Sequence, residues 1–305
     1  MRHLLILVMF NVFLFSKELI TPIPLENNYN VKKALLGQKL FFDTRLSYNN
    51  SVSCASCHII NDGGDDNLPV SFGVDGKTGI RNSPTVLNSK YNILQFWDGS
   101  AKNLKEQAKG PIHNPVEMNS NFEDIIIKLE KDKDYKKSFL AIYKDGISAD
   151  NIVDAISEFE NTLITPNSRF DKYLRGDINI LTKDEQNGYK LFKEYGCISC
   201  HNGINIGGNL VQKIGIMKNF DTEDLGRFNI TKNSSDKFYF KVPTLRNIDL
   251  TAPYLHNGEI KTLKEVVEIM IDYQIGYELE KKEVDNIVKF LKTLTGETPK
   301  KIELP

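Results

Sequence analysis

Apolar residues return every three or four positions along most of the chain, which is the spacing of one face of an α-helix. This periodicity predicts helices over residues 122–143, 152–163, 263–273 and 284–294. Alternation of apolar and polar residues is confined to the short segment 237–242, a weak signal for a strand. The pattern therefore predicts a mainly α fold.

A short amphipathic pattern occurs twice, as Gly-Gln-Lys-Leu-Phe at 37–41 and as Gly-Tyr-Lys-Leu-Phe at 188–192. Each copy predicts a short helix that leads toward a pair of cysteines. The repeat indicates two homologous domains. We place the boundary at the helix-breaking residues Thr-Pro-Asn at 165–167, which gives an N-terminal domain of residues 17–165 and a C-terminal domain of residues 166–305.

Two predicted helices of the C-terminal domain carry a start signal. Thr182 is followed three residues later by Glu185, and Thr262 by Glu265. This spacing is typical of a capping box, in which the two side chains satisfy free backbone N–H groups of the first turn.

The first residues have the order of an export signal. Arg2 and His3 precede an apolar run over residues 4–15, which is too short to cross a bilayer as a helix. We expect residues 1–16 to be a signal peptide, with an uncleaved anchor as the alternative because no small-x-small cleavage site is visible. Either interpretation places the folded protein outside the cytoplasm, in the periplasm.

Composition and charge are those of an ordinary globular protein. The 305 residues are 40% hydrophobic and 26% charged, and the formal net charge is −1. A nearly neutral chain without a run of Lys or Arg lacks the basic surface that nucleic acid requires. Nucleic-acid binding is therefore not expected.

All four cysteines belong to two C-x-x-C-H motifs. Two disulfides would leave the histidine behind each pair unexplained, the pairs are too far apart for a usual zinc site, and a thioredoxin-like motif would occur once. Two cysteines three apart can each form a thioether to a haem, and the next histidine can bind the iron. The sequence predicts two covalently bound c-type haems, on Cys54, Cys57 and His58 and on Cys197, Cys200 and His201.

The second axial ligand of each iron decides between an electron carrier and an enzyme. Outside the signal, the remaining candidates are His113, His256, Met118, Met217 and Met270. A Met ligand raises the potential of a haem relative to a His ligand, so a His/Met haem would receive electrons. Periodicity alone leaves Met270 equally consistent with ordinary packing in the core of its helix.

Several segments resemble the bacterial di-haem cytochrome c peroxidases, a family that includes the MauG-type enzymes. With the two haem motifs, the resemblance covers residues 34–296. The segments are L-F-F-D-T-R-L-S, R-N-S-P-T-V-L-N, F-W-D-G-S, E-Q-A-K-G-P-I-H-N-P-V-E-M, V-P-T-L-R-N-I, L-T-A-P-Y-L-H-N-G and L-K-T-L-T-G.

The resemblance implies a division of labour between the haems. The N-terminal haem would be the low-potential, peroxidatic one, and the C-terminal haem the high-potential one with Met270 as its second ligand. Glu117 matches the acid-base carboxylate, Gln107 its neighbouring amide, and Trp97 the aromatic bridge between the haems. From the residues alone, Glu117 is more simply a solvated acid and Trp97 a core residue. A buried carboxylate with a raised pKa could nevertheless move a proton between the two oxygens of a peroxide.

The family pattern also implies a calcium ion at the domain junction. Asn82, Thr251 and Pro253 match its ligands. His256 matches a position close to the high-potential haem that does not bind the iron.

One departure concerns the N-terminal haem. Well-studied family members place a histidine on this haem in the oxidised state, from a loop just before R-N-S-P-T. Here Val74 stands at that position, and no histidine lies between His58 and His113. The sequence therefore predicts an N-terminal haem that is open to peroxide without prior reduction of its partner.

Three functions follow from these observations. The first is a periplasmic peroxidase that reduces hydrogen peroxide to water with electrons from a small c-type cytochrome. The second is a MauG-like oxidase of a protein side chain, whose high-potential haem has a Tyr ligand; Met270 opposes it, although Tyr273 and Tyr277 lie near. The third is a di-haem electron carrier, which would have no use for Glu117 and Gln107. The sequence leaves open whether the chain forms a homodimer.

Overall fold

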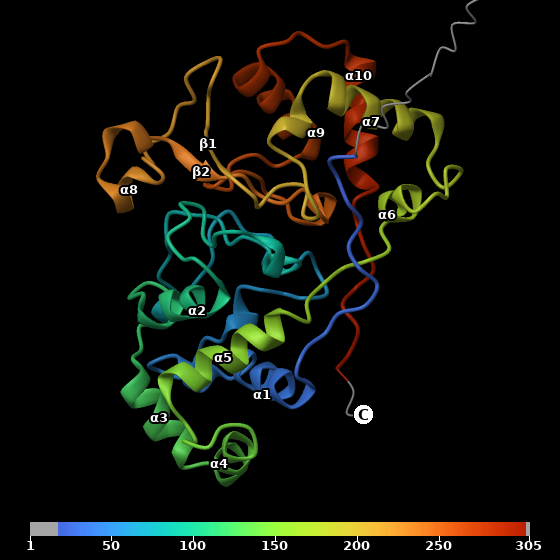
Figure 1. The fold of residues 1–305 in the computed structure, drawn as a ribbon. Helices are drawn as coiled ribbons and strands as arrows, with labels where there is room; N and C mark the ends of the chain where they lie inside the picture. Colours follow the sequence, from blue (N-terminus) through green and yellow to red (C-terminus); the bar gives the residue numbers. More distant parts are fainter. Residues whose placement is uncertain (1–17, 303–305) are drawn as a thin grey trace, which may run out of the picture.

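The computed structural model describes residues 18–302 and is mainly helical, as predicted (Figure 1). The predicted signal peptide at 1–16 lies outside the described residues. Within residues 18–302, no helix is long and apolar enough to cross a membrane. The helices are α1 (Val31–Phe41), α2 (Leu104–His113), α3 (Phe122–Glu130), α4 (Lys133–Leu140), α5 (Ala149–Glu160), α6 (Arg169–Leu174), α7 (Lys183–Glu194), α8 (Phe228–Thr231), α9 (Leu263–Met270) and α10 (Lys281–Lys292).

The described residues form two lobes, each around its own hydrophobic core (Figure 1). In the first lobe α1 packs against α5, and in the second α7 packs against α10. Both ends of the chain cross over: Ile20 lies in the core of the second lobe, and Ile302 lies in the core of the first. The lobes are thus joined by three segments, although the boundary drawn at 165/166 stays a prediction.

A glycine permits the central helix crossing in each lobe. A Cβ atom on Gly37 would lie 1.8 Å from the carbonyl oxygen of Ala155, and a Cβ on Gly188 would lie 1.9 Å from that of Asn286. No side chain fits at such distances, so the backbones of α1 and α5, and of α7 and α10, are in direct contact. This accounts for the glycine that opens both copies of the repeated pattern.

Most local predictions agree with the structure. Both capping boxes form, at Thr182 with Glu185 and at Thr262 with Glu265. The predicted strand is shorter than 237–242: it is β2 (Tyr239–Lys241), which pairs antiparallel with β1 (Val211–Lys213).

The helical pattern over 122–143 forms two helices instead of a continuous one. The break falls at Asp132, whose side chain accepts hydrogen bonds from the N–H groups of Asp134 and Tyr135. An Asp in this position caps a new helix, so the local hydrogen bonds end α3 and begin α4 although the apolar spacing continues.

The two lobes also repeat in their loops. Asn88 and Asn247 have φ of 60° each, and at the same separation along the chain Phe96 and Leu255 have φ of 63° and 71°. A positive φ is uncommon for residues that carry a Cβ, and rare for large ones. Because Trp97 and His256 follow directly, the repeat places these two side chains at equivalent positions of the two lobes.

Candidate active site

Both C-x-x-C-H motifs fold into a short 3₁₀ turn, η2 (Cys54–Ser56) and η5 (Cys197–Ser199). In each motif the N–H of the histidine donates to the carbonyl of the first cysteine, at 3.1 Å in the first and 3.0 Å in the second. All four cysteines are free thiols. Each turn therefore presents two thiols and one imidazole together, as haem attachment requires.

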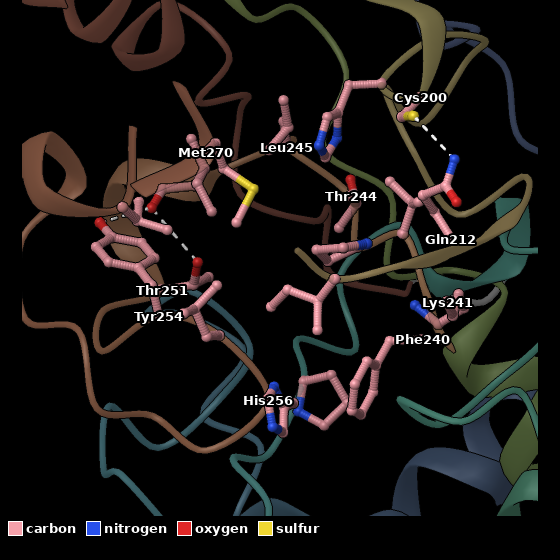
Figure 2. Close-up of a pocket in the computed structure, with 18 of the residues that line it drawn as sticks. Cys200, Gln212, Phe240, Lys241, Thr244, Leu245, Thr251, Tyr254, His256 and Met270 are labelled. Atoms are coloured by element: carbon pink, nitrogen blue, oxygen red, sulfur yellow. Dashed lines mark hydrogen bonds between the residues drawn. The ribbon is translucent and has the colours of Figure 1, made fainter. Parts of the chain in front are cut away.

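The cavity of the second lobe has a volume of about 270 Å³. Cys197, Cys200, His201 and Met270 all line it, and Figure 2 shows the sulfur of Met270 directed into it. Burial lowers the pKa of His201 to about 4, so its imidazole is neutral at physiological pH. Two thiols, a neutral imidazole and a thioether around one cavity fit a haem c with His and Met ligands.

Met270 stands at a change of helix type. It is the last residue of α9, and the π-helical turn η8 (Ile271–Ile275) follows directly. Short π-helical turns redirect side chains and occur often at functional sites. Tyr273 and Tyr277 do not line the cavity, so Met270 is the candidate that the structure brings to it.

The cavity of the first lobe is larger, about 610 Å³. Cys54, Cys57 and His58 line it, together with Gln107 from α2 and Glu117 from the loop that follows. One ring nitrogen of His58, Nδ1, lies 3.1 Å from the carbonyl oxygen of Gly64. A proton held on Nδ1 by this carbonyl leaves Nε2 free to bind an iron. These residues also fit a haem c.

Glu117 is a largely buried carboxylate. Burial raises its pKa, and the hydrogen bond that Oε1 accepts from Nδ2 of Asn114 at 2.6 Å opposes this rise. The same bond fixes the orientation of the carboxylate toward the cavity it shares with Gln107. A positioned carboxylate with a raised pKa is suited to exchange protons with a ligand in the cavity.

The loop that carries Val74 packs against the Glu117 segment. The N–H of Val74 donates to the carbonyl of Glu117 at 2.8 Å, and a Cβ on Gly73 would lie 2.1 Å from the carbonyl oxygen of Val116. The side chain of Val74 is fully buried and does not line the haem cavity. The loop thus supports the Glu117 segment and brings no ligand from position 74 to the haem.

Trp97 lines both cavities. Its indole N–H donates to the carbonyl of Asn82 at 2.9 Å, which fixes the ring between the lobes. The ring meets His256 edge to face at a centroid distance of 6.4 Å. Trp97 therefore lies where both cavities can reach it, and its role as a bridge between haems stays a prediction.

His256 lines the second cavity but is engaged by protein groups. Its ring stacks on Phe240 at 4.3 Å (Figure 2). Its Nε2 lies 3.0 Å from the hydroxyl of Thr222. The side chain is 2% exposed. These contacts agree with a place beside the haem and not on its iron.

The three predicted calcium ligands lie around the second cavity. Asn82, Thr251 and Pro253 all line it, and the amide N–H of Asn82 donates to the carbonyl of Leu68 at 2.9 Å. Asp65 lines the same cavity, is 1% exposed, and has a carboxylate oxygen without a hydrogen-bond partner. Oxygen atoms of these kinds suit calcium.

Glu160 and Lys241 are among the buried charged residues that sequence reasoning missed. Glu160 lines the first cavity, and burial raises its pKa to about 8. Its position could have been noticed, because it continues the buried row of Ile152 and Ile156 at a spacing of four. Lys241 lines the second cavity, and burial lowers its pKa to about 8. Its alternating segment gave no sign of which face would be buried.

Two lobes, each with a C-x-x-C-H turn that opens into a cavity, define a protein with two haem c groups. Comparison with known families agrees. The family described as di-haem cytochrome c peroxidase matches residues 31–179, and the cytochrome c family matches residues 185–295.

Curated relatives extend the match to nearly the whole chain. The cytochrome c551 peroxidase of Nitrosomonas europaea is 48% identical over 93% of this chain and 86% of its own length. The cytochrome c551 peroxidase of Pseudomonas aeruginosa is 46% identical over 88% of this chain and 80% of its own. The chain belongs to the di-haem cytochrome c peroxidase family, which confirms the predicted family and its enzyme class.

Other relatives show the breadth of the family. The cytochrome c peroxidase Ccp of Escherichia coli is 49% identical over 92% of this chain, but this chain spans only 61% of its length. The MauG protein of Methylophilus methylotrophus is 30% identical over 90% of this chain and 86% of its own. A solved MauG-like protein associated with microbial copper homeostasis has the same fold, with a TM-score of 0.82, 28% identity and coverage of 95% and 96% of the two chains.

Proposed function

We propose that this protein is a cytochrome c peroxidase that reduces hydrogen peroxide to water in the cavity of the first lobe. Electrons would come from a small c-type cytochrome and pass through the haem of the second lobe. The observation that carries the proposal is the placement of Glu117. A buried carboxylate lies in the cavity of His58, whereas no glutamate is among the residues that line the cavity of His201.

The haems supply the chemistry of one-electron transfer that two-electron reduction of a peroxide needs. The chain supplies position and protons. Reduction consumes two protons and two electrons and yields two water molecules. The carboxylate of Glu117 takes a proton from one oxygen of the peroxide and returns it to the departing oxygen, where it completes a water molecule. The amide of Gln107 shares the cavity and can hold the peroxide by hydrogen bonds.

Trp97 marks the route between the lobes in this proposal. It is the one tryptophan of the chain, and its ring is held against both cavities by Asn82 and His256. An aromatic ring in this place shortens the path that an electron must cover between the two haems.

The test is steady-state oxidation of reduced cytochrome c by hydrogen peroxide. We expect peroxide-dependent turnover by the mature di-haem protein. A Glu117→Gln variant that keeps full turnover would favour the alternative of a pure electron carrier. The MauG-like alternative is disfavoured, because Met270 lines the cavity where a Tyr ligand would be needed.

The N-terminal haem would accept peroxide in the fully oxidised protein. This proposal follows from Val74, which brings no ligand to the first cavity. Turnover should start at the same rate whether the protein is fully oxidised or half reduced beforehand. A six-coordinate, low-spin N-terminal haem in the oxidised protein, seen by electron paramagnetic resonance, would refute it.

A calcium ion would join the lobes through Asn82, Thr251 and Pro253. Asn82 belongs to the first lobe and the other two to the second, and the unpartnered carboxylate of Asp65 would offset part of the charge of the ion. Removal of calcium with a chelator should lower the melting temperature and slow turnover, and added calcium should restore both. No change in either after chelation would contradict the proposal.

Export to the periplasm rests on residues 1–16 and on the haem motifs. Expression of the full chain followed by fractionation tests it. We expect mature haem protein in the periplasmic fraction, with a new N-terminus near residue 17.

A further inference from the structure

Lys241 is a buried cation that has no counter-charge among the described residues. It belongs to β2, lines the cavity of the second lobe and is 5% exposed. Its backbone N–H donates to the carbonyl of Trp97 at 2.7 Å, so the residue is fixed beside the aromatic bridge. Within residues 18–302, its ammonium forms no ion pair with a carboxylate. Figure 2 shows Lys241 among the side chains around the cavity.

No carboxylate among the described residues neutralises the ammonium of Lys241. Burial of an unpaired ammonium is costly, and Lys is rarely buried unless it is paired. The one carboxylate that lines the same cavity is that of Asp65, whose Oδ1 has no partner of its own. The two side chains therefore share a cavity without pairing, which indicates that each faces a charged group that occupies the site.

The position equivalent to Lys241 in the first lobe is uncharged. The repeated loop is preceded by Asn-Ser-Pro-Thr in the first lobe and by Lys-Val-Pro-Thr in the second. Asn82 and Lys241 therefore stand at equivalent positions. Both residues line the second cavity, but only Lys241 carries a charge. The charge is thus a property of one lobe and not of the shared scaffold.

We propose that Lys241 binds a propionate carboxylate of the haem attached at Cys197 and Cys200, and that its positive charge raises the reduction potential of this haem. A cation near a haem stabilises the reduced state, because reduction adds a negative charge. Lys241 is a positioning residue in this role, since it does not bind the iron. The inference rests on attachment of the haem and not on the proposed peroxide chemistry.

The experiment is a redox titration of each haem, monitored by its absorbance, in the mature protein and its variants. In Lys241→Met we expect the ratio of reduced to oxidised C-terminal haem at a fixed potential to fall about tenfold, which is about 59 mV for one electron. The N-terminal haem should change less. Lys241→Arg, which keeps the charge, should stay close to the original protein. An unchanged potential in Lys241→Met would overturn the proposal.

Lys213→Met is the matched control. Lys213 lies on the paired strand β1, is partly exposed and does not line the cavity, so the same loss of charge should leave both potentials in place. An equal shift in this control would overturn the proposal, because a general charge effect would then explain the result.

Lys241→Gln replaces Lys241→Met in the redox titration if the Met variant does not incorporate haem. It removes the charge and keeps a hydrogen-bond donor, and the same tenfold fall is expected. Loss of haem from both neutral variants but not from Lys241→Arg would also support the pairing. Loss from all three variants would overturn it, because shape and not charge would then be required.

Discussion

The two cavities are built on the same scaffold but are lined by different side chains. In both lobes a glycine-mediated helix crossing supports a C-x-x-C-H turn, and a loop with a positive-φ residue brings an aromatic ring, Trp97 or His256, to the cavity. The second cavity receives Met270, which can close the coordination of an iron. The first receives Glu117 and Gln107, which can handle protons.

The difference lies in segments outside the repeated scaffold. Glu117 follows α2, and Met270 ends α9 where the helix becomes a π-helical turn. In the proposed function, a loop and a helix end would give one copy of a duplicated haem-binding fold its enzymatic role. The following predictions test how far this separation holds.

Glu117→Gln should lower peroxide turnover by roughly 10² to 10⁴, the usual contribution of general acid-base catalysis. The amide cannot accept the proton of the peroxide, whereas the second cavity is untouched. Steady-state assays with reduced cytochrome c measure the loss. Glu123→Gln, at an exposed position of α3, is the matched control and should keep full activity. A similar loss of turnover in Glu117→Gln and Glu123→Gln would mean that Glu117 has no special role in the first cavity.

Arg246→Leu should lower the free energy of unfolding by about 3–5 kcal/mol, because it removes the cation that neutralises the buried carboxylate of Asp171. The two side chains are fully buried and joined by a 2.6 Å ion pair. The repeat places Leu87 at the equivalent position of the first lobe, so the pair belongs to the second lobe alone. Urea unfolding provides the measurement.

The control for this variant is Arg169→Leu. Arg169 pairs with Glu185 but is 45% exposed, so its loss should cost less than about 1 kcal/mol. If Arg246→Leu and Arg169→Leu lowered the free energy of unfolding equally, burial would not determine how much an ion pair contributes to stability.

Met270→Leu should lower the reduction potential of the C-terminal haem, because the thioether ligand is lost. We expect a fall of roughly a hundredfold in the reduced-to-oxidised ratio at a fixed potential, or about 120 mV. Met217→Leu, at a side chain that is 61% exposed, should change nothing. A redox titration in which Met270→Leu also left the potential unchanged would mean that Met270 is a core residue.

Asn114→Ala should move the acid limb of the pH profile to higher pH. Turnover needs Glu117 as a carboxylate, so activity falls as the pH falls through its pKa. Burial raises that pKa above the ordinary value of 4.5, and the hydrogen bond from Asn114 lowers it. Loss of the bond therefore raises the pKa further. The measurement is kcat/KM against pH, and a limb that moved to lower pH would contradict this account.

Local sequence signals predicted most of the fold. The helices, both capping boxes and the thiol-imidazole turns depend on residues within a few positions of one another. The break before α4 was missed because Asp132 caps a new helix while the apolar spacing continues. The crossing of Ile20 and Ile302 into the opposite cores had no local signal at all.

The residues of the site also fall into those that local sequence signals predicted and those that only the structure revealed. The haem-attachment residues follow from spacing, whereas Met270 was equally a core residue until the structure placed its sulfur in the cavity. The roles of Glu117 and Trp97 came from the resemblance, and their burial came from the fold. Lys241 and Glu160 emerged only from the structure, because burial of a charge depends on all the segments that surround it.

The sequence by itself determined that this chain holds two haems, because thioether attachment needs cysteines and a histidine at fixed, short spacing. Only the tertiary structure decided which side chains complete each cavity. Ligands, protons and buried charges reach a haem from distant segments, and the packing of those segments sets their distance and their exposure to water.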